Sequence, residues 1–168
     1  QQEALDRAAA FADVWQRLVW TTPELDETLR GRPVNAAALP AWDAARAARR
    51  DAAVRALAAD HGLFFLFGPG CVACGQMAAA LAQVEERYGL RVQAVAVAGA
   101  RHPAFPAAWP DNGFAARLGV RAYPALVLAR LTPASRRLIP LGYGPLAAGE
   151  IAERIEVLAA APPPGARF

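Results

Sequence analysis

The apolar positions change their spacing near residue 62, and this change divides the chain into two parts. Before it, we expect three helices. The first covers residues 1–20, where apolar side chains recur at helical spacing. The second starts at Thr22-Pro23-Glu24, a capping hydroxyl followed by proline and an acid. The third runs from Ala41 to about Asp60, a stretch rich in Ala and Arg, and Gly62 is expected to end it.

After residue 62 the pattern indicates short strands alternating with helices. The continuous apolar run Leu63–Phe67 is typical of a strand buried on both faces. Residues 71–88 have apolar side chains on one helical face and end at Gly89, and residues 91–98 predict a second buried strand. The remaining expected segments are a Pro-rich loop at 99–110, a short helix at 111–118, strands at 125–129 and 137–141, and a helix at 147–160.

This order of elements predicts the fold class. Two parallel β-α-β crossovers followed by a hairpin and a closing helix form an α/β, thioredoxin-like fold, with a central mixed sheet flanked by helices. The N-terminal α-helical extension precedes it. We therefore divide the chain into a helical region at 1–60, a thioredoxin-like domain at 61–160 and a Pro-rich flexible tail at 161–168.

Composition and charge argue against several classes of protein. The 168 residues are 55% hydrophobic, enough for a core without structural disulfides, and the formal net charge is +3. This weak, scattered charge argues against a nucleic-acid partner. No apolar run reaches the roughly 18 residues of a transmembrane segment.

The two cysteines form one motif, Cys71-Val72-Ala73-Cys74, at the predicted head of a helix. The free N–H groups and positive dipole end of a first helical turn favour the thiolate, so Cys71 is the expected nucleophile. Cys74, one turn further, lies close enough to resolve a mixed disulfide. Val72 and Ala73 are the residues that a bound substrate would meet. They add neither charge nor imidazole, so we expect a middling redox potential.

Other interpretations of this motif remain. A CxxC pair can be half of a zinc site, but His61 and His102 lack the spacing of a zinc finger. We therefore expect neither a metal nor another cofactor. A vestigial dithiol on a binding protein is a further alternative.

Tyr123-Pro124 is the second feature with chemical meaning. The proline comes just before a predicted strand, which a cis peptide bond would explain, although a trans turn proline would fit as well. In thioredoxin-like domains such a cis-proline loop faces the dithiol and binds the substrate backbone. Phe65, six residues before Cys71, stands where many thioredoxins bury an acid. This makes fast general reduction a less favoured activity.

Several short segments together resemble the conjugal transfer pilus assembly protein TraF / TrbB family of F-type type IV secretion systems. The resemblance covers residues 20–158 and rests on segments such as 57–65, 86–90, 115–120, 123–125 and 142–144. It implies a periplasmic protein that takes part in assembling a conjugative pilus. The best-known TraF lacks the CxxC, whereas TrbB-like relatives keep it and resemble disulfide isomerases.

Three hypotheses follow. The first is a periplasmic thiol:disulfide oxidoreductase or isomerase whose partners are proteins of the secretion and pilus system. The second is a non-enzymatic pilus-assembly factor whose thioredoxin-like domain binds proteins. A periplasmic reductase ranks third because of Phe65. The sequence leaves the oligomeric state open.

Overall fold

The computed structural model describes residues 11–12, 15, 33, 35–132 and 137–159. Most of the helices predicted at 1–20 and from Thr22, together with the tail at 161–168, therefore lie outside the described residues. The chain divides into two compact units, Gln1–Ala48 and Arg49–Phe168. This division falls inside helix α3 (Leu39–Leu57), and the domain boundary at residue 60 stays a prediction.

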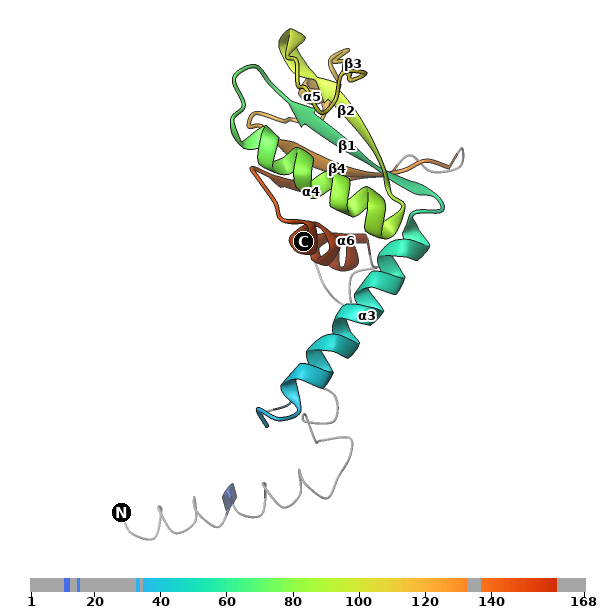
Figure 1. Ribbon diagram of the computed structural model, residues 1–168, viewed down its shortest axis with the longest axis vertical. Helices are drawn as coiled ribbons and strands as arrows, with labels where there is room; N and C mark the ends of the chain where they lie inside the picture. Colours follow the sequence, from blue (N-terminus) through green and yellow to red (C-terminus); the bar gives the residue numbers. More distant parts are fainter. Residues whose placement is uncertain (1–10, 13–14, 16–32, 34, 133–136, 160–168) are drawn as a thin grey trace, which may run out of the picture. The chain divides into compact units, whose positions relative to one another are not determined.

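One mixed sheet organises the second unit (Figure 1). Its strand order is β3-β2-β1-β4-β5, with β1 parallel to β2 and antiparallel to β4. The strands are β1 (His61–Phe67), β2 (Arg91–Ala96), β3 (Trp109–Pro110), β4 (Ala125–Arg130) and β5 (Leu138–Tyr143).

Helices cover both faces of this sheet. Helices α4 (Ala73–Tyr88) and α6 (Ala148–Ala159) pack on one face in the larger core cluster, and the short α5 (Phe114–Arg117) packs on the other. A 3-10 turn (Val97–Gly99) follows β2. The predicted thioredoxin-like α/β fold is confirmed.

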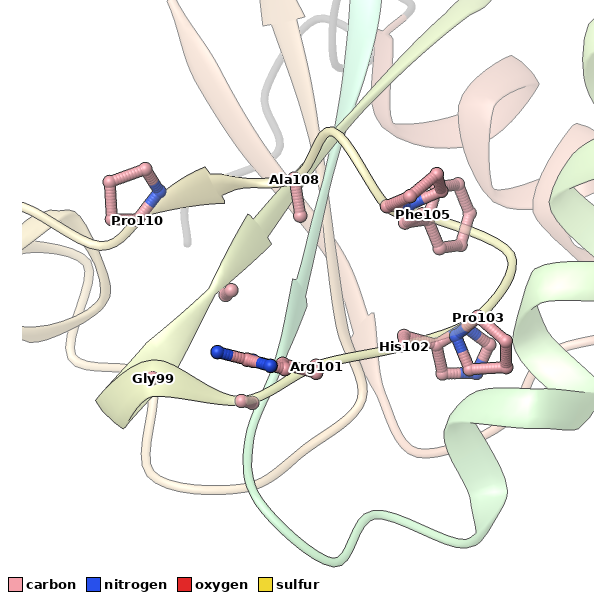
Figure 2. Close-up of a pocket in the computed structure, with 10 residues that line it drawn as sticks. Gly99, Arg101, His102, Pro103, Phe105, Ala108 and Pro110 are labelled. Carbon is pink, nitrogen blue, oxygen red and sulfur yellow. The ribbon is translucent and has the colours of Figure 1, made fainter.

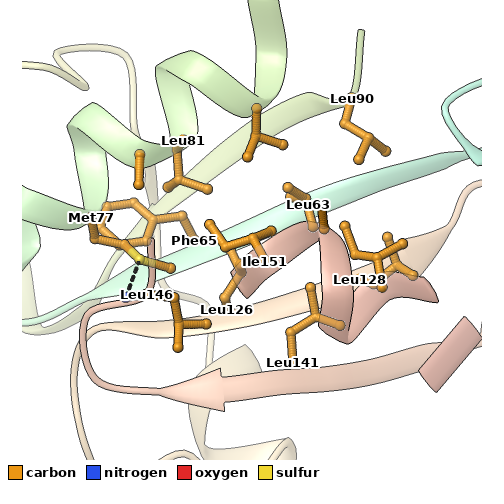
Figure 3. Packing of buried hydrophobic residues seen from close by; sticks show 14 of the residues in the cluster. Leu63, Phe65, Met77, Leu81, Leu90, Leu126, Leu128, Leu141, Leu146 and Ile151 are labelled. Atoms are coloured by element: carbon orange, nitrogen blue, oxygen red, sulfur yellow. Dashed lines mark hydrogen bonds between the residues drawn. The ribbon is translucent and has the colours of Figure 1, made fainter. Parts of the chain in front are cut away.

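The side chains of β1 explain why this strand lies at the centre. Leu63 and Phe65 point to the face of α4 and α6 (Figure 3). Phe67 belongs to the same core cluster, and each of the three side chains is at most 1% exposed. Leu66 and the half-buried Phe64 point to the face of α5. Because successive residues of a strand face opposite sides, a continuous apolar run is what a strand covered on both faces requires.

Two predicted boundaries were wrong. Helix α3 ends at Leu57, and Gly62 lies inside β1, where a Cβ would come within 3.3 Å of the Arg91 carbonyl oxygen. The Pro-rich segment predicted as a loop ends in the edge strand β3, which pairs in parallel with Val95 and Ala96. Pro110 fits there because an edge strand can lack a backbone N–H on its open side.

The second crossover was also predicted wrongly: β4 runs antiparallel to β1. A parallel β4 would need an element long enough to carry the chain back across the sheet. Helix α5 has only four residues, so the chain re-enters the sheet at the end where β1 finishes, and Leu66 pairs with Ala125. This brings the start of β4 next to the segment that follows β1.

Both outer strands of the sheet contain a proline. Pro110 lies in β3, and Pro140 lies in β5, opposite Val127 and beside an irregularity in the register. The five-strand sheet therefore presents interrupted hydrogen-bonding edges on both sides.

A buried carboxylate joins the second half of α3 to the end of α4. Asp51 is 6% exposed and accepts hydrogen bonds from both Nε and Nη2 of Arg87 and from the Tyr88 hydroxyl, the last at 2.9 Å. Burial alone would raise the pKa of the Asp51 carboxyl. The hydrogen bonds from Arg87 and Tyr88 and the charges of Arg87 and Arg50 hold that pKa below its ordinary value of 3.8.

We predict that Asp51→Asn lowers the free energy of unfolding at neutral pH by about 1–3 kcal/mol, because it weakens a buried charge-assisted network. The folded-state pKa is depressed, so this stabilisation is present above about pH 3.8 and is lost as the pH falls through the folded-state pKa. Denaturant unfolding at neutral and acidic pH measures both effects. The control Glu150→Gln, which breaks an exposed pair with Arg154, should cost about 0.5 kcal/mol or less. Equal losses in the two variants would contradict the prediction.

Candidate functional site: a disulfide beside a cis-proline loop

The two cysteines follow the central strand directly. Gly68-Pro69-Gly70 turns the chain after β1, and Gly70 takes a positive φ of 66° just before Cys71. Cys71 and Cys74 form a disulfide, with Cα atoms 5.4 Å apart, at the start of α4. The backbone N–H of Cys74 donates to the Cys71 carbonyl, which begins the helical turn between the two sulfurs.

The two sulfur positions differ in exposure. Cys71 is half-buried, whereas Cys74 is 1% exposed and belongs to the core cluster that also contains Met77. Val72 is 93% exposed and Ala73 is half-buried. A substrate can therefore approach Cys71 past Val72, while Cys74 is shielded. This asymmetry suits a pair in which one thiol attacks and the other resolves.

A small pocket of about 270 Å³ opens beside the disulfide. One side comes from the end of β1 and the start of α4, including Phe67 and both cysteines. The other side comes from Arg101 and His102, in the segment that leaves β2. The carboxyl ends of parallel strands meet at one edge of a sheet, and this is why β1 and β2 deliver these groups to the same place.

His102 is a residue of this pocket that sequence reasoning treated only as a potential zinc ligand. Its ring is held by edge contact with Phe67, with centroids 5.8 Å apart, and by Phe105 at 5.7 Å. The backbone N–H of Ala104 donates to His102 Nδ1 at 3.2 Å. The neutral imidazole must then carry its proton on Nε2, which makes Nε2–H a hydrogen-bond donor of a residue that lines the same pocket as the cysteines.

The expected cis-proline loop is present, and it lies against the turn that precedes the dithiol. The Tyr123-Pro124 peptide bond is cis, and Pro124 is buried. The Pro124 carbonyl accepts a hydrogen bond from the Gly144 N–H at 2.7 Å, which ties the loop to the end of β5. The Tyr123 ring lies against Gly68: a Cβ at Gly68 would come within 2.8 Å of Tyr123 Cδ2. The structure thus brings Tyr123 and Pro124 together with the turn that leads to Cys71.

No buried acid lies beneath the disulfide in the described part of the chain. Phe65 is fully buried and packs against Phe67 and Phe105, with ring centroids 5.6 Å and 5.2 Å away. Asp51 is the buried charged residue among those described, and its partners Arg87 and Tyr88 lie at the opposite end of α4 from the cysteines. The described residues also hold no cluster of three His, Cys, Asp or Glu side chains suited to a metal.

The fold and the site define a thioredoxin-like domain with a CxxC disulfide and a cis-proline loop that contacts the turn leading to the first cysteine. The chain belongs to the family described as "TraF: F plasmid transfer operon protein", which it matches over residues 1–156. It is 30% identical over 148 residues to Protein TraF of Escherichia coli K12, a match that covers 88% of this chain and 59% of that relative. This chain thus spans well under two thirds of the length of that relative.

The comparison with solved structures finds three proteins that align with somewhat more than half of this chain. Thioredoxin-2, a component of the malaria parasite's protein secretion machinery, is 13% identical, with a TM-score of 0.41 over 58% of this chain and 82% of its own. The dsbF protein of MTB is 21% identical, with a TM-score of 0.41 over 61% and 84%. A secreted Mycobacterium tuberculosis disulfide oxidoreductase homologous to E. coli DsbE is 20% identical, with a TM-score of 0.39 over 61% and 85%.

The contact between Gly68 and Tyr123 yields a stability prediction. Gly68→Ala should lower the free energy of unfolding by about 1–3 kcal/mol, since the new methyl group forces the Tyr123 ring to move. Most of this loss should disappear in a Tyr123→Ala background, which a double-mutant cycle of denaturant unfolding measures. Gly75→Ala is the matched control, because a Cβ there meets open space on helix α4. A loss at Gly68 that is independent of Tyr123 would refute the contact.

The donor at His102 yields a redox prediction. We predict that in the reduced protein the Nε2–H of His102 donates to the Cys71 thiolate. His102→Leu should then shift the dithiol–disulfide equilibrium with glutathione about tenfold towards the disulfide, because it removes this hydrogen bond of about 1.5 kcal/mol. The thiolate fraction at neutral pH, followed by ultraviolet absorbance, should fall as well. His102→Gln keeps a side-chain N–H donor and should restore part of both values. Equal behaviour of the wild type and the Leu variant would show that the imidazole only fills space.

Proposed function

We propose that this protein is a periplasmic thiol:disulfide oxidoreductase or isomerase that acts on proteins of a conjugative type IV secretion and pilus-assembly system. The observation that carries the proposal is the asymmetric disulfide at the head of α4, with half-buried Cys71 and buried Cys74, in a chain whose cis-proline loop contacts the turn before Cys71. Membership of the TraF family supports the choice of clients.

The chemistry needs only the two sulfurs and a client. In the oxidising direction, a client thiolate attacks Cys71, a client–Cys71 bond forms, and the Cys71–Cys74 bond breaks to release the Cys74 thiolate. A second client thiolate then attacks the client sulfur of the mixed disulfide. This step leaves the client oxidised and both cysteines reduced. For isomerisation the reduced Cys71 thiolate attacks a client disulfide, and a different client thiolate later displaces it with no net change in oxidation.

The neighbouring residues have positioning roles in this proposal. The backbone at Tyr123 pairs with the client chain, while Val72 and Ala73 offer an apolar contact on the opposite side of Cys71. Among the described residues, the backbone hydrogen bonds outside helices and strands include one to Pro124 and none to Tyr123. The main chain of Tyr123 is therefore available to a client strand.

The alternative function is that of a non-enzymatic assembly factor, and the presence of Phe65 in place of a buried acid favours it. Without a buried carboxylate beneath Cys74, deprotonation of the resolving thiol depends on water or on a more distant group, which slows exchange. The alternative is an assembly factor that binds pilus proteins through the thioredoxin-like domain without catalysis. Its dithiol would then be dispensable. A reductase delivering electrons in the periplasm is less well supported for the same reason.

Refolding of a scrambled-disulfide protein separates these functions. Wild-type protein should accelerate recovery of the native client, and Cys71→Ser should reduce the rate to background because it removes the attacking sulfur. Cys74→Ser should instead accumulate a client–Cys71 mixed disulfide, visible on a non-reducing gel and released by a reductant. Val157→Ser serves as a control, because Val157 is an exposed apolar residue of helix α6 and the variant keeps both thiols and the residues around them. Equal rates with wild type and Cys71→Ser would favour the non-enzymatic assembly factor.

A further inference from the structure

A larger pocket lies next to the dithiol pocket, in the segment that joins β2 to β3 (Figure 2). Its volume is about 720 Å³. We call it the loop pocket; its lining includes Ala96 at the end of β2 and residues between Gly99 and Pro110. The left-handed backbone of Ala98 and Gly99, with φ of 51° and 72°, turns the chain away from β2 and opens this space.

The walls of the loop pocket are mainly apolar and conformationally restricted. Pro103, Pro106 and Pro110 line it together with Phe105 and Ala108. Proline fixes φ, so these walls lose little freedom when a ligand binds. A concave, mostly apolar site with a few polar groups is the usual form of a binding pocket.

The loop pocket and the dithiol pocket are neighbours that share two lining residues. Arg101 and His102 line both. Figure 2 shows the Arg101 side chain between Gly99 and His102 at the loop pocket, with His102 and Pro103 on the side of helix α4. A client joined to Cys71 would therefore extend its neighbouring residues past Arg101 into the loop pocket.

Arg101 gives this junction an uncompensated positive charge. In the described part of the chain, the guanidinium groups of Arg87, Arg130 and Arg154 each pair with a carboxylate. Arg101 is exposed and has no such partner among the described residues. Arg101 and His102 are the titratable side chains among the residues lining the loop pocket, and no acid is present there. A guanidinium in this position is suited to a carboxylate of the ligand.

We propose that the loop pocket binds the client segment flanking the reactive cysteine, and that Arg101 selects segments carrying Asp or Glu at this place. The occupant is an extended peptide stretch of the client, with its apolar side chains against the prolines and Phe105 and its carboxylate on Arg101. This inference deepens the proposed function and depends on it for the covalent step.

The test uses the full oxidised chain and two synthetic peptides, each with one cysteine, that differ only by Asp or Asn two residues from it. The peptide thiolate attacks Cys71, the Cys71–Cys74 bond breaks, and the proton of the peptide thiol passes to solvent. For each protein we measure the rate of mixed-disulfide formation with the Asp peptide and divide it by the rate with the Asn peptide. The Asp-to-Asn ratio of the wild type is then divided by that of Arg101→Gln, so that the intrinsic reactivity of each peptide thiol cancels. We expect this quotient to be about two- to fivefold in favour of Asp and to fall as salt increases.

Arg91→Gln is the matched control, because Arg91 is exposed at the opposite end of β2 from the pocket. Its Asp-to-Asn ratio should equal that of the wild type. The proposal is overturned if the Asp-to-Asn rate ratio is the same in the wild type and in Arg101→Gln. It is also overturned if Arg91→Gln lowers this ratio as much as Arg101→Gln does.

A non-covalent measurement keeps this proposal separate from the proposed function. Serine versions of both peptides are titrated against the oxidised protein, and binding is followed by fluorescence polarisation. Tighter binding of the Asp peptide that requires Arg101, without thiol exchange in the cysteine versions, would support the loop pocket and refute the enzymatic function. Thiol exchange with no preference for Asp in either measurement would support the enzymatic function and refute the loop pocket.

Discussion

The antiparallel pairing of β4 with β1 is the constraint on which the site depends. Leu66, near the end of β1, pairs with Ala125, the first residue of β4. The residues just after β1 and just before β4 must therefore be neighbours, and these are the turn that leads to Cys71 and the Tyr123-Pro124 loop. The contact between Gly68 and Tyr123 is the direct result. A parallel β4 would have placed the proline loop at the far edge of the sheet.

The same sheet edge gathers groups with different chemical tasks. The parallel pair β1 and β2 brings Cys71 and His102 to one pocket, and the antiparallel pair adds Tyr123 from the other side of β1. Helix α4 adds its N-terminal backbone, which favours negative charge at the half-exposed sulfur. Cys74 instead points into the core with Met77. The division between an accessible and a shielded sulfur is thus a consequence of packing along α4.

Much of this could be predicted from the sequence because local patterns carry it. The apolar run of β1, the face of α4 that ends at Gly89 and the CxxC at the strand–helix junction all depend on neighbouring residues. The cis peptide bond at Pro124 followed from proline beside a strand. The direction of β4 could not be predicted from such local patterns, because it depends on the length of the segment that returns to the sheet, and α5 is only four residues long.

The position of His102 in the dithiol pocket was missed because this residue lies far from the cysteines in the sequence. Its place in the sequence could have revealed it: His102 follows β2, and the residues that follow two paired parallel strands meet at the same edge of the sheet.

The prolines of the two outer strands have a consequence for how the domain meets other chains. Pro110 in β3 and Pro140 in β5 each remove an N–H from a strand that has only one neighbour. Another extended chain would find a gap in the ladder at either border and could not continue the sheet for long. The domain is thereby protected from edge-to-edge association with other extended chains.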